Sequence, residues 1–372
     1  MKYIYQHADW PNFTWDDGRL LTLLGQVRNL QGKLIGKMEA LGFELQSEAV
    51  LRTMALEVIK STEIEGEILN PEQVRSSVAR QLGIDISGSV PSNQKIDGVV
   101  DMLADATQNF NQPLTKPRLF GWHCALFPTG HSGLNKISVG NWRDDVAGPL
   151  QVVSGAIGKE ILHFQAPDAA GLESEMDSFI AWFNKTDNLD PVIKAGIAHL
   201  WFVTLHPFDD GNGRIARALA DMLLARADGM PQRYYSMSAQ IRKDRNGYYT
   251  ILENTQKGTL DITDWLDWFL GCLLNALESS GQILATVIDK HRFWNKNAPQ
   301  IQNNRQKLLL NKLLDGFDGK LTSSKWAKIA KCSPDTALRD IQDLINKQIL
   351  RKAEGGGRST SYELIEPGDV NY

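Results

Sequence analysis

Cysteine is scarce in this 372-residue chain, and the three that occur, Cys124, Cys272 and Cys332, lie far apart. An odd number at such spacings excludes a framework of paired disulfides and the close cysteine spacing of a zinc site. Few, unpaired cysteines are usual in a reducing compartment. The cysteine pattern therefore favours the cytosol.

Long apolar runs are also missing. The apolar uncharged segment AGIAHLWFVTLHPF at residues 195–208 is shorter than the roughly 20 residues that a membrane-spanning helix needs, and it contains two histidines. The first residues, MKYIYQHADWPNFTW, lack the basic and apolar regions of a signal peptide. The sequence therefore predicts a cytoplasmic protein.

Neither sign of charge dominates the chain. It has 40 Lys and Arg against 44 Asp and Glu, a net charge of -4. This balance excludes a general attraction to nucleic acid or membrane, so any such interaction must come from a local patch. Apolar residues at 42% and charged residues at 23% are typical of soluble globular proteins, and the length predicts two or three domains.

Apolar residues spaced three and four apart predict a mainly α-helical fold. The helical pattern covers residues 17–80, then about 95–110, 115–127, 171–185, 189–205, 212–227 and 261–290. One segment differs from the rest. Between Pro149 and Pro167, two short runs rich in Val, Ile, Leu and Phe flank Gly155 and Gly158. This arrangement predicts a β-hairpin over residues 150–164.

The composition becomes polar near residue 296, in NKNAPQIQNNRQ, which predicts a linker. Beyond it, three helical stretches precede two short strands around a glycine-rich turn, the order of a winged helix-turn-helix. Ser333 is the expected N-cap of the third helix, with Pro334 at its first position. Residues 335–347 carry three acidic and two basic side chains, which argues against DNA binding, although lysines elsewhere could line one face. DNA binding, protein contact and a purely structural role all stay open.

The segment LHPFDDGNGRIAR, residues 205–217, combines groups suited to handling a phosphate. A helix predicted from about Asn212 offers free N–H groups and a partial positive charge at its start. Gly211 and Gly213 let an oxygen approach the backbone closely. Arg214 and Arg217 share one helix face, where both can fork onto phosphate oxygens.

Two further groups in this segment suit catalysis. An aspartate beside a phosphate repels it unless a divalent cation lies between them, so Asp210 is the expected Mg²⁺ ligand. His206 is the group able to accept a proton near neutral pH. Each residue alone has an ordinary use, as a structural histidine, a helix cap, a turn or a solvated face. The combination is different. At roughly 5% usage per residue, seven fixed residues (His206, Phe208, Gly211, Asn212, Gly213, Arg214 and Arg217) occur together by chance in fewer than about one in a million chains of this length.

HPFDDGNGRIAR matches the Fic family motif, His-x-Phe-x-Asp/Glu-Gly-Asn-Gly-Arg-x-x-Arg, at every specified position. WPNFTWD with QGKLIGKMEALGF resembles the N-terminal region of bacterial Fic proteins, and VSGAIGKEILHFQAP resembles their flap. The resemblance implies an N-terminal helical region (1–110), an all-helical Fic core (111–295) and a winged helix (296–372). It also implies transfer of AMP from ATP and Mg²⁺ to a hydroxyl of a target protein, and homodimers are common among relatives.

The resemblance also implies roles for individual residues. His206 would deprotonate a target Ser, Thr or Tyr, Asp210 would hold Mg²⁺, and the motif would bind the nucleotide through Gly211, Asn212, Gly213, Arg214, Ile215, Ala216 and Arg217. Tyr248 or Tyr249, in KDRNGYYTIL, would lie against adenine, although a helix with buried tyrosines has the same pattern. The related death-on-curing kinases have lysine where this chain has Gly213, which favours AMP transfer. The hairpin at 150–164 would hold the target by strand addition.

A second motif lies upstream, in VIKSTEIEGEIL. Gly66 is a natural helix C-cap, so Glu65 could simply be a solvated residue of the last turn. Ser61-x-x-x-Glu65-Gly66 nevertheless fits the inhibitory motif Ser/Thr-x-x-x-Glu-Gly/Asn of one Fic class. A bidentate pair between Glu65 and Arg217 would occupy the place of the γ-phosphate.

Three functions remain open from the sequence. The first is a protein adenylyltransferase restrained by Glu65. The second is removal of AMP from a modified protein, or transfer of another nucleotide. The third is a DNA-binding regulator in which the Fic core senses ATP.

Overall fold

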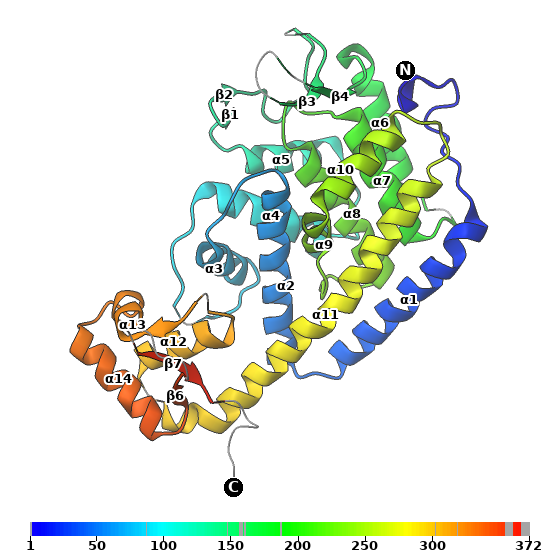
Figure 1. Cartoon of the computed structure of the whole chain (residues 1–372). Coiled ribbons are helices and arrows are strands. Elements are labelled where there is room, and N and C mark those ends of the chain that lie inside the picture. Colours follow the sequence, from blue (N-terminus) through cyan, green and yellow to red (C-terminus); the bar gives the residue numbers. More distant parts are fainter. Residues whose placement is uncertain are drawn as a thin grey trace. The chain divides into compact units, whose positions relative to one another are not determined.

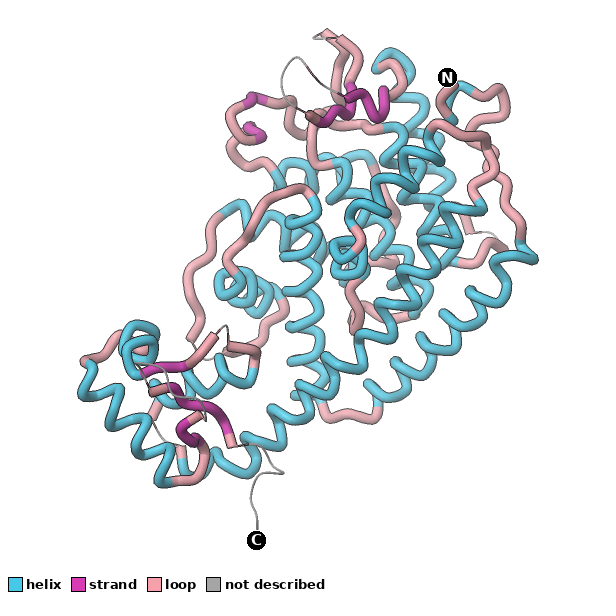
Figure 2. The backbone as a smooth tube through the Cα atoms, in the orientation of Figure 1, coloured by secondary structure: helices cyan, strands magenta, loops and turns pink. Residues whose placement is uncertain are grey.

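Helices dominate the computed structural model, as the apolar spacing predicts (Figures 1 and 2). The structure describes residues 2–86, 88–146, 148–155, 159, 161–186, 188–301, 303–317, 319–353 and 360–365. The chain divides into two units, Met1–Asp85 with Ser89–Gly281, and Ile86–Gly88 with Gln282–Tyr372. None of the described helices is long and apolar enough to cross a membrane.

The described helices are α1 (Asp17–Glu39), α2 (Phe43–Ile64), α3 (Pro71–Gln81), α4 (Gln94–Gln108), α5 (Lys116–Leu126), α6 (Leu172–Asn184), α7 (Pro191–Leu205), α8 (Asn212–Asp228), α9 (Met237–Lys243), α10 (Arg245–Gln256), α11 (Thr263–Asn297), α12 (Asn304–Leu314), α13 (Ser323–Ile329) and α14 (Pro334–Asn346). Short 3-10 turns lie at Ile4–Gln6, Ala169–Gly171 and Ala298–Gln300.

Among the described residues, the strands are short and antiparallel and form three small sheets. They are β1 (His131–Ser132), β2 (Asn135–Lys136), β3 (Gln151–Ser154), β4 (Ile161–Gln165), β5 (Leu321–Thr322), β6 (Leu350–Lys352) and β7 (Ser361–Leu364). The predicted hairpin is confirmed as β3–β4, with a bulge between Val152 and Val153. Residues 156–158 and 160, where we predicted the turn, lie outside the described residues.

Helix α7 is the centre of the larger unit, because every residue from Val192 to Leu205 is buried. It packs along α8. On another side it approaches α11 closely at Gly196, where a Cβ would collide with Leu266. The carbonyl of Gly196 also accepts a hydrogen bond from Trp265 Nε1 at 2.8 Å. A central helix enclosed in this way holds the loop that follows it in a fixed place.

The smaller unit has its own apolar core, around Trp326, Ile341 and Leu344. The predicted cap of its third helix is present, since Ser333 Oγ accepts from the Thr336 N–H at 3.2 Å. Two details of this unit were not predicted from the sequence. Helix α11 continues to Asn297 through the segment near 296, because Phe293 and Trp294 pack against this core. The sheet also has a third strand, β5, which pairs with β7.

Candidate active site

The loop from His206 to Gly211 joins α7 to α8, and its backbone is fixed at both ends. His206 ends α7 in the left-handed region, at φ 49° and ψ 58°. Gly211 has φ 85°, and a Cβ there would collide with the Phe127 ring, so both conformation and space require glycine. Phe208 lies between these two residues, and the side chain of Asn212 binds its backbone at both ends. Asn212 Oδ1 accepts from the Phe208 N–H at 3.0 Å, and Asn212 Nδ2 donates to the Phe208 carbonyl at 2.7 Å.

Phe208 anchors this loop in the core. Its side chain is fully buried and stacks on His123, with ring centroids 4.1 Å apart. His123 Nδ1 accepts from the Gly140 N–H, so its Nε2–H is left to donate to the Asp210 carbonyl, both at 3.2 Å. Burial lowers the pKa of His123 to about 4, which keeps this bridging ring neutral. His123 could not be predicted as a supporting residue, because an isolated histidine in a helix has no distinguishing sequence pattern.

His206 is arranged to accept a proton. Its Nδ1 lies 3.3 Å from the Val203 carbonyl, so a proton on Nδ1 donates there and Nε2 keeps a lone pair. Burial lowers the pKa of His206 to about 4. The imidazole is therefore neutral near pH 7, the form that a general base requires.

Arg143 holds the backbone beneath His206, and sequence reasoning missed it. Its Nε donates to the His206 carbonyl at 2.8 Å, and its own N–H donates to the Pro207 carbonyl at 2.9 Å. The guanidinium is fully buried and pairs with Asp145 at 2.7 Å. Since Arg143 lies 63 residues before His206, no short motif could have linked the two.

The start of α8 presents two buried arginines. Arg214 is 1% exposed and Arg217 2% exposed. Arg214 Nε and Nη1, and Arg217 Nη1, are buried and have no hydrogen-bond partner among the described residues. Buried N–H groups of a charged side chain are costly to leave unpaired. Together with the free N–H groups of the first helical turn, they form a site for an anion.

The remaining motif residues predicted to contact the nucleotide do not all have side chains free to do so. Ile215 and Ala216 are fully buried on the core side of α8, so only their backbone could face a ligand. Gly213 lies against α2, where a Cβ would collide with Glu65 Oε1. The side chain of Asn212 is committed to Phe208. Phosphate contact from these positions would therefore use the main chain.

The Asp210 carboxylate lies beside the arginines and is 42% exposed. It accepts from the Gly211 N–H and from the Ser132 hydroxyl, and Oδ1 lies 3.6 Å from Arg214 Nη2. The described residues contain no group of three or more His, Cys, Asp or Glu able to hold a metal ion. A single exposed carboxylate nevertheless fits Mg²⁺, which is commonly held by one or two carboxylates together with substrate phosphates.

Glu65 from α2 contacts Arg217. Helix α2 ends at Ile64, and Gly66 closes it at φ 85°, with its N–H donating to the Glu63 carbonyl at 3.1 Å. Glu65 Oε1 lies 2.7 Å from Arg217 Nη2. The expected bidentate pair is wrong, because a single Glu65 oxygen contacts the guanidinium. Ser61 Oγ accepts from Nε and the Ser61 carbonyl from Nη2, both at 2.8 Å, while Nη1 has no partner among the described residues.

The two tyrosines of α10 point differently. Tyr248 is 2% exposed, and its hydroxyl is 2.9 Å from His199 Nε2. Tyr249 is 37% exposed and lies beneath the Arg245 guanidinium, 5.0 Å from the ring centroid. Of the two, Tyr249 alone has a surface that a ligand can reach.

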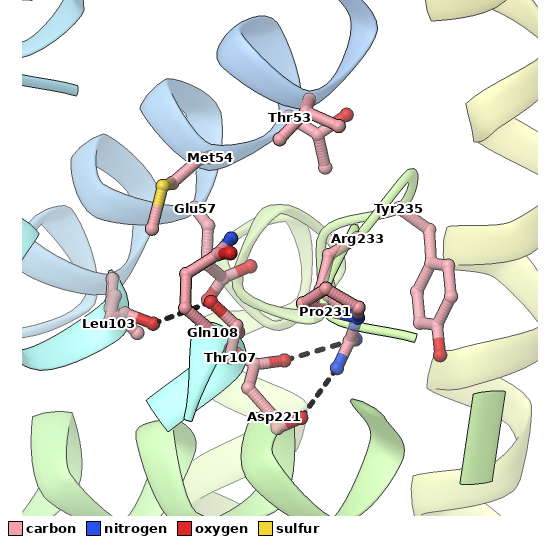
Figure 3. Close-up of a pocket in the computed structure, with 11 residues that line it drawn as sticks. Thr53, Met54, Glu57, Leu103, Thr107, Gln108, Asp221, Pro231, Arg233 and Tyr235 are labelled. Carbon is pink, nitrogen blue, oxygen red and sulfur yellow. Dashed lines mark hydrogen bonds and ion pairs between the residues drawn. The ribbon is translucent and has the colours of Figure 1, made fainter. Parts of the chain in front are cut away.

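A small cavity lies farther along the contact between α2 and α8 (Figure 3). Its volume of about 20 Å³ is enough for a water molecule but far too small for a nucleotide. Glu57, Asp221 and Arg233 line it, and Arg233 Nη2 lies 3.1 Å from Asp221 Oδ1. This group is structural and separate from the site at the start of α8.

The loop that holds the neutral His206 leads into a helix start with buried, unpaired arginine N–H groups, an arrangement that could bind a phosphate group. Residues 113–224 match the model of the Fic/DOC family, and residues 3–84 match a domain of unknown function, DUF4172. The chain contains a Fic family domain at residues 113–224.

Several known proteins resemble parts of the chain. A protein adenylyltransferase Fic of Nematostella vectensis is 34% identical over 116 residues, 30% of this chain and 25% of that protein. One of Culex quinquefasciatus is 27% identical over 226 residues, 59% of this chain and 40% of that protein. The chain thus matches well under half the length of these relatives.

A solved Fic family protein from Desulfovibrio desulfuricans has the same fold, with a TM-score of 0.50 at 19% identity, over 94% of this chain and 97% of that one. A Fic domain-containing signalling protein from Bacteroides thetaiotaomicron also has a TM-score of 0.50, at 22% identity, over 72% of this chain and 97% of that one. At these identities the likeness supports the fold alone.

Proposed function

We propose that this protein transfers AMP from ATP to a hydroxyl group of a target protein, and that Glu65 restrains the transfer. The observation that carries the proposal is the pair of buried arginines, Arg214 and Arg217, whose unpaired N–H groups lie beside a neutral histidine. The similarity of the Fic domain to proteins named adenylyltransferases supports the same reaction.

In this mechanism His206 Nε2 takes the proton of the target hydroxyl while its oxygen bonds to the α-phosphorus of ATP. The bond from that phosphorus to the bridging oxygen breaks, and pyrophosphate leaves with the electron pair. Arg214 and Arg217 stabilise the charge on the departing phosphates. Mg²⁺, held by Asp210, would neutralise charge between that carboxylate and the phosphates. His206 then releases its proton to water.

Two surfaces would complete the site. The half-exposed ring of Tyr249 is the one available to adenine. The β3–β4 hairpin carries exposed apolar side chains, Val153, Ile161 and Leu162, and its strands could pair with an extended segment of the target.

The test uses ATP labelled at the α-phosphorus or at the γ-phosphorus, incubated with a cell lysate and the Glu65→Gly variant. We expect protein labelling from the first ATP only, and its loss when His206→Ala is added, by about 10²–10⁴-fold for removal of a general base. Labelling from γ-labelled ATP would replace the proposal with a kinase. Unchanged labelling in the His206→Ala variant would remove that residue from its role.

A further inference from the structure

Charge is distributed very unequally along the chain. From residue 282 onward there are 15 Lys and Arg against 10 Asp and Glu, whereas the remaining residues have 25 against 34. The overall net charge of -4 therefore conceals a C-terminal unit of +5 and a remainder of -9. A small unit with this excess of positive charge attracts polyanions.

The acidic residues of α14, which argue against DNA binding when counted in the sequence, are mostly neutralised. Asp340 is 6% exposed and accepts from Arg305 Nε at 2.8 Å and from Asn303 Nδ2 at 2.8 Å. Asp343 accepts from Lys347 Nζ at 2.6 Å and from Gln306 Nε2 at 2.8 Å. Both carboxylates are thus satisfied on the side of α14 that faces α12.

The solvent-facing stripe of α14 has a different chemistry. It carries Arg339, Gln342 and Asn346, spaced three and four residues apart and all exposed, with Asp335 at its beginning. Their hydrogen bonds are local, within one turn of α14: Arg339 Nε to the Asp335 carbonyl at 3.4 Å, and Gln342 Nε2 to Asn346 Oδ1 at 3.1 Å. Guanidinium and amide groups are the side chains that form paired hydrogen bonds with base edges in the major groove.

Lysines lie on the neighbouring elements. Lys328 on α13, Lys331 in the turn before α14, and Lys352 on β6 are exposed, and none pairs with a carboxylate of a described residue. A helix that presents base-reading side chains, next to lysines that can contact phosphates, has the arrangement of a DNA-reading surface.

We propose that the C-terminal unit binds double-stranded DNA, with the Arg339–Gln342–Asn346 stripe facing the major groove and Lys328 and Lys331 contacting phosphates. This activity is independent of AMP transfer, since it uses no residue of the Fic motif. The charge excess and the neutralised acidic side of α14 favour DNA over a protein partner for this surface.

The test measures fluorescence anisotropy of a labelled, mixed-sequence duplex of about 20 base pairs with the full chain, at several salt concentrations. Loss of two phosphate contacts in the Lys328→Ala/Lys331→Ala double variant should weaken binding and reduce the slope of log affinity against log salt by about two. The matched control is Lys33→Ala/Lys37→Ala, which removes the same charge from the exposed face of α1 and should leave binding unchanged.

A second arm tests the stripe. On a duplex enriched from a random pool by the wild type, Arg339→Ala should weaken binding by about 5- to 150-fold and relax the base preference at one position. Three results would overturn the proposal: no binding by the wild type at low salt, equal losses in the α1 control, or an unchanged affinity in both C-terminal variants. Any of them would leave this surface to a protein contact.

Discussion

Helix α2 takes part in two polar clusters, one with Arg217 of α8 and one near Asp221 of α8, and the two differ in their surroundings. The exposed contact, Ser61 and Glu65 with Arg217, lies at the start of α8, and the Glu65 side chain is 28% exposed. The buried contact, Glu57 with Asp221 and Arg233, lies farther along the same pair of helices, and each of the three residues is at most 7% exposed. Glu57 is further held by the hydroxyls of Ser236 and Ser238.

The difference separates a contact that a ligand can replace from one that it cannot. An anion reaching Arg217 can exchange with the Glu65 carboxylate, because water already reaches that carboxylate. Nothing larger than water fits the cavity at the buried contact, so no ligand can replace the partners of its charged groups. We therefore expect changes at the exposed contact to alter activity, and changes at the buried contact to alter stability.

The largest effect should come from removing the cation of the buried contact. Arg233→Leu leaves Asp221 and Asp228, 3.1 and 3.9 Å from the guanidinium, without their positive partner. At pH 8, where Asp221 is mostly ionised, breaking a buried ion pair in this way should lower the free energy of unfolding by about 3–5 kcal/mol. Denaturant unfolding monitored by tryptophan fluorescence measures the loss.

The control for this variant is Arg80→Leu. Arg80 also pairs with an aspartate, Asp97, at 2.8 Å, but its side chain is 58% exposed, so the expected loss is about 0–1 kcal/mol. Equal losses in the two variants would mean that burial does not distinguish the contacts.

At the exposed contact, Glu65→Gly should raise AMP transfer, including transfer onto the protein itself. Without the Glu65 carboxylate, the unpaired Nη1 of Arg217 and the N–H of Nη2 that Glu65 held can bind the γ-phosphate, which aligns the α-phosphorus with the attacking hydroxyl. Since a misplacement of about 1 Å can cost 10²-fold in rate, we expect a gain of about 10- to 1000-fold. Incorporation of α-labelled ATP into protein measures it.

Glu63→Gly is the matched control, because Glu63 points away from Arg217. Its carboxylate contacts Lys60 at 2.8 Å and Arg242 at 3.5 Å. Equal labelling by wild type and Glu65→Gly across several targets would return Glu65 to the role of an ordinary helix end.

The sequence predicted the exposed contact and could not predict the buried one. Ser61, Glu65 and Arg217 belong to short motifs whose spacing carries the information. Arg233 lies in the loop after α8. Glu57 lies in the middle of α2, and a single charged residue within a helix usually indicates a side chain exposed to solvent. Only the packing of the helices brings them together. The same limit applied to His123 and Arg143, which support the catalytic loop from distant segments.

Fold class was predictable because apolar spacing over long helices is a strong signal. The errors fell where segments were short or their partners were distant in sequence. The strand β5 has two residues, too few for any alternation to be visible. The segment near residue 296 is polar on average, yet Phe293 and Trp294 in it pack against a core that the sequence does not reveal.

A third variant tests the claim that the arginine N–H groups await an anion. Arg214→Ala removes charge-assisted hydrogen bonds to phosphate, a loss of about 1.5–3 kcal/mol in ATP binding, or roughly 10- to 150-fold in Kd. Isothermal titration calorimetry in the Glu65→Gly background measures it without competition from Glu65. An unchanged Kd would separate Arg214 from the nucleotide.

The smallest expected effect is a pH dependence that belongs to the buried contact. Burial raises the pKa of Asp221 from 3.8 to about 7, and the nearby Glu57 carboxylate adds to the shift. Between these values the folded protein binds a proton that the unfolded chain does not. The stability that Asp221 contributes is therefore fully present below about pH 4 and is lost as pH rises through about 7.

Asp221→Asn isolates this contribution. Burial lowers the pKa of His123, His199 and His206 to about 4, 3 and 4. These histidines therefore lower the free energy of unfolding in the opposite direction, as pH falls below 6.5. They are present in both proteins and cancel in the comparison. From pH 5 to pH 7, the wild type should lose about 1–2 kcal/mol of unfolding free energy relative to the variant. Denaturant unfolding of both proteins at the two pH values measures the difference. A constant difference would mean that Asp221 stays ionised beside Arg233, and the buried contact would then be an ordinary ion pair.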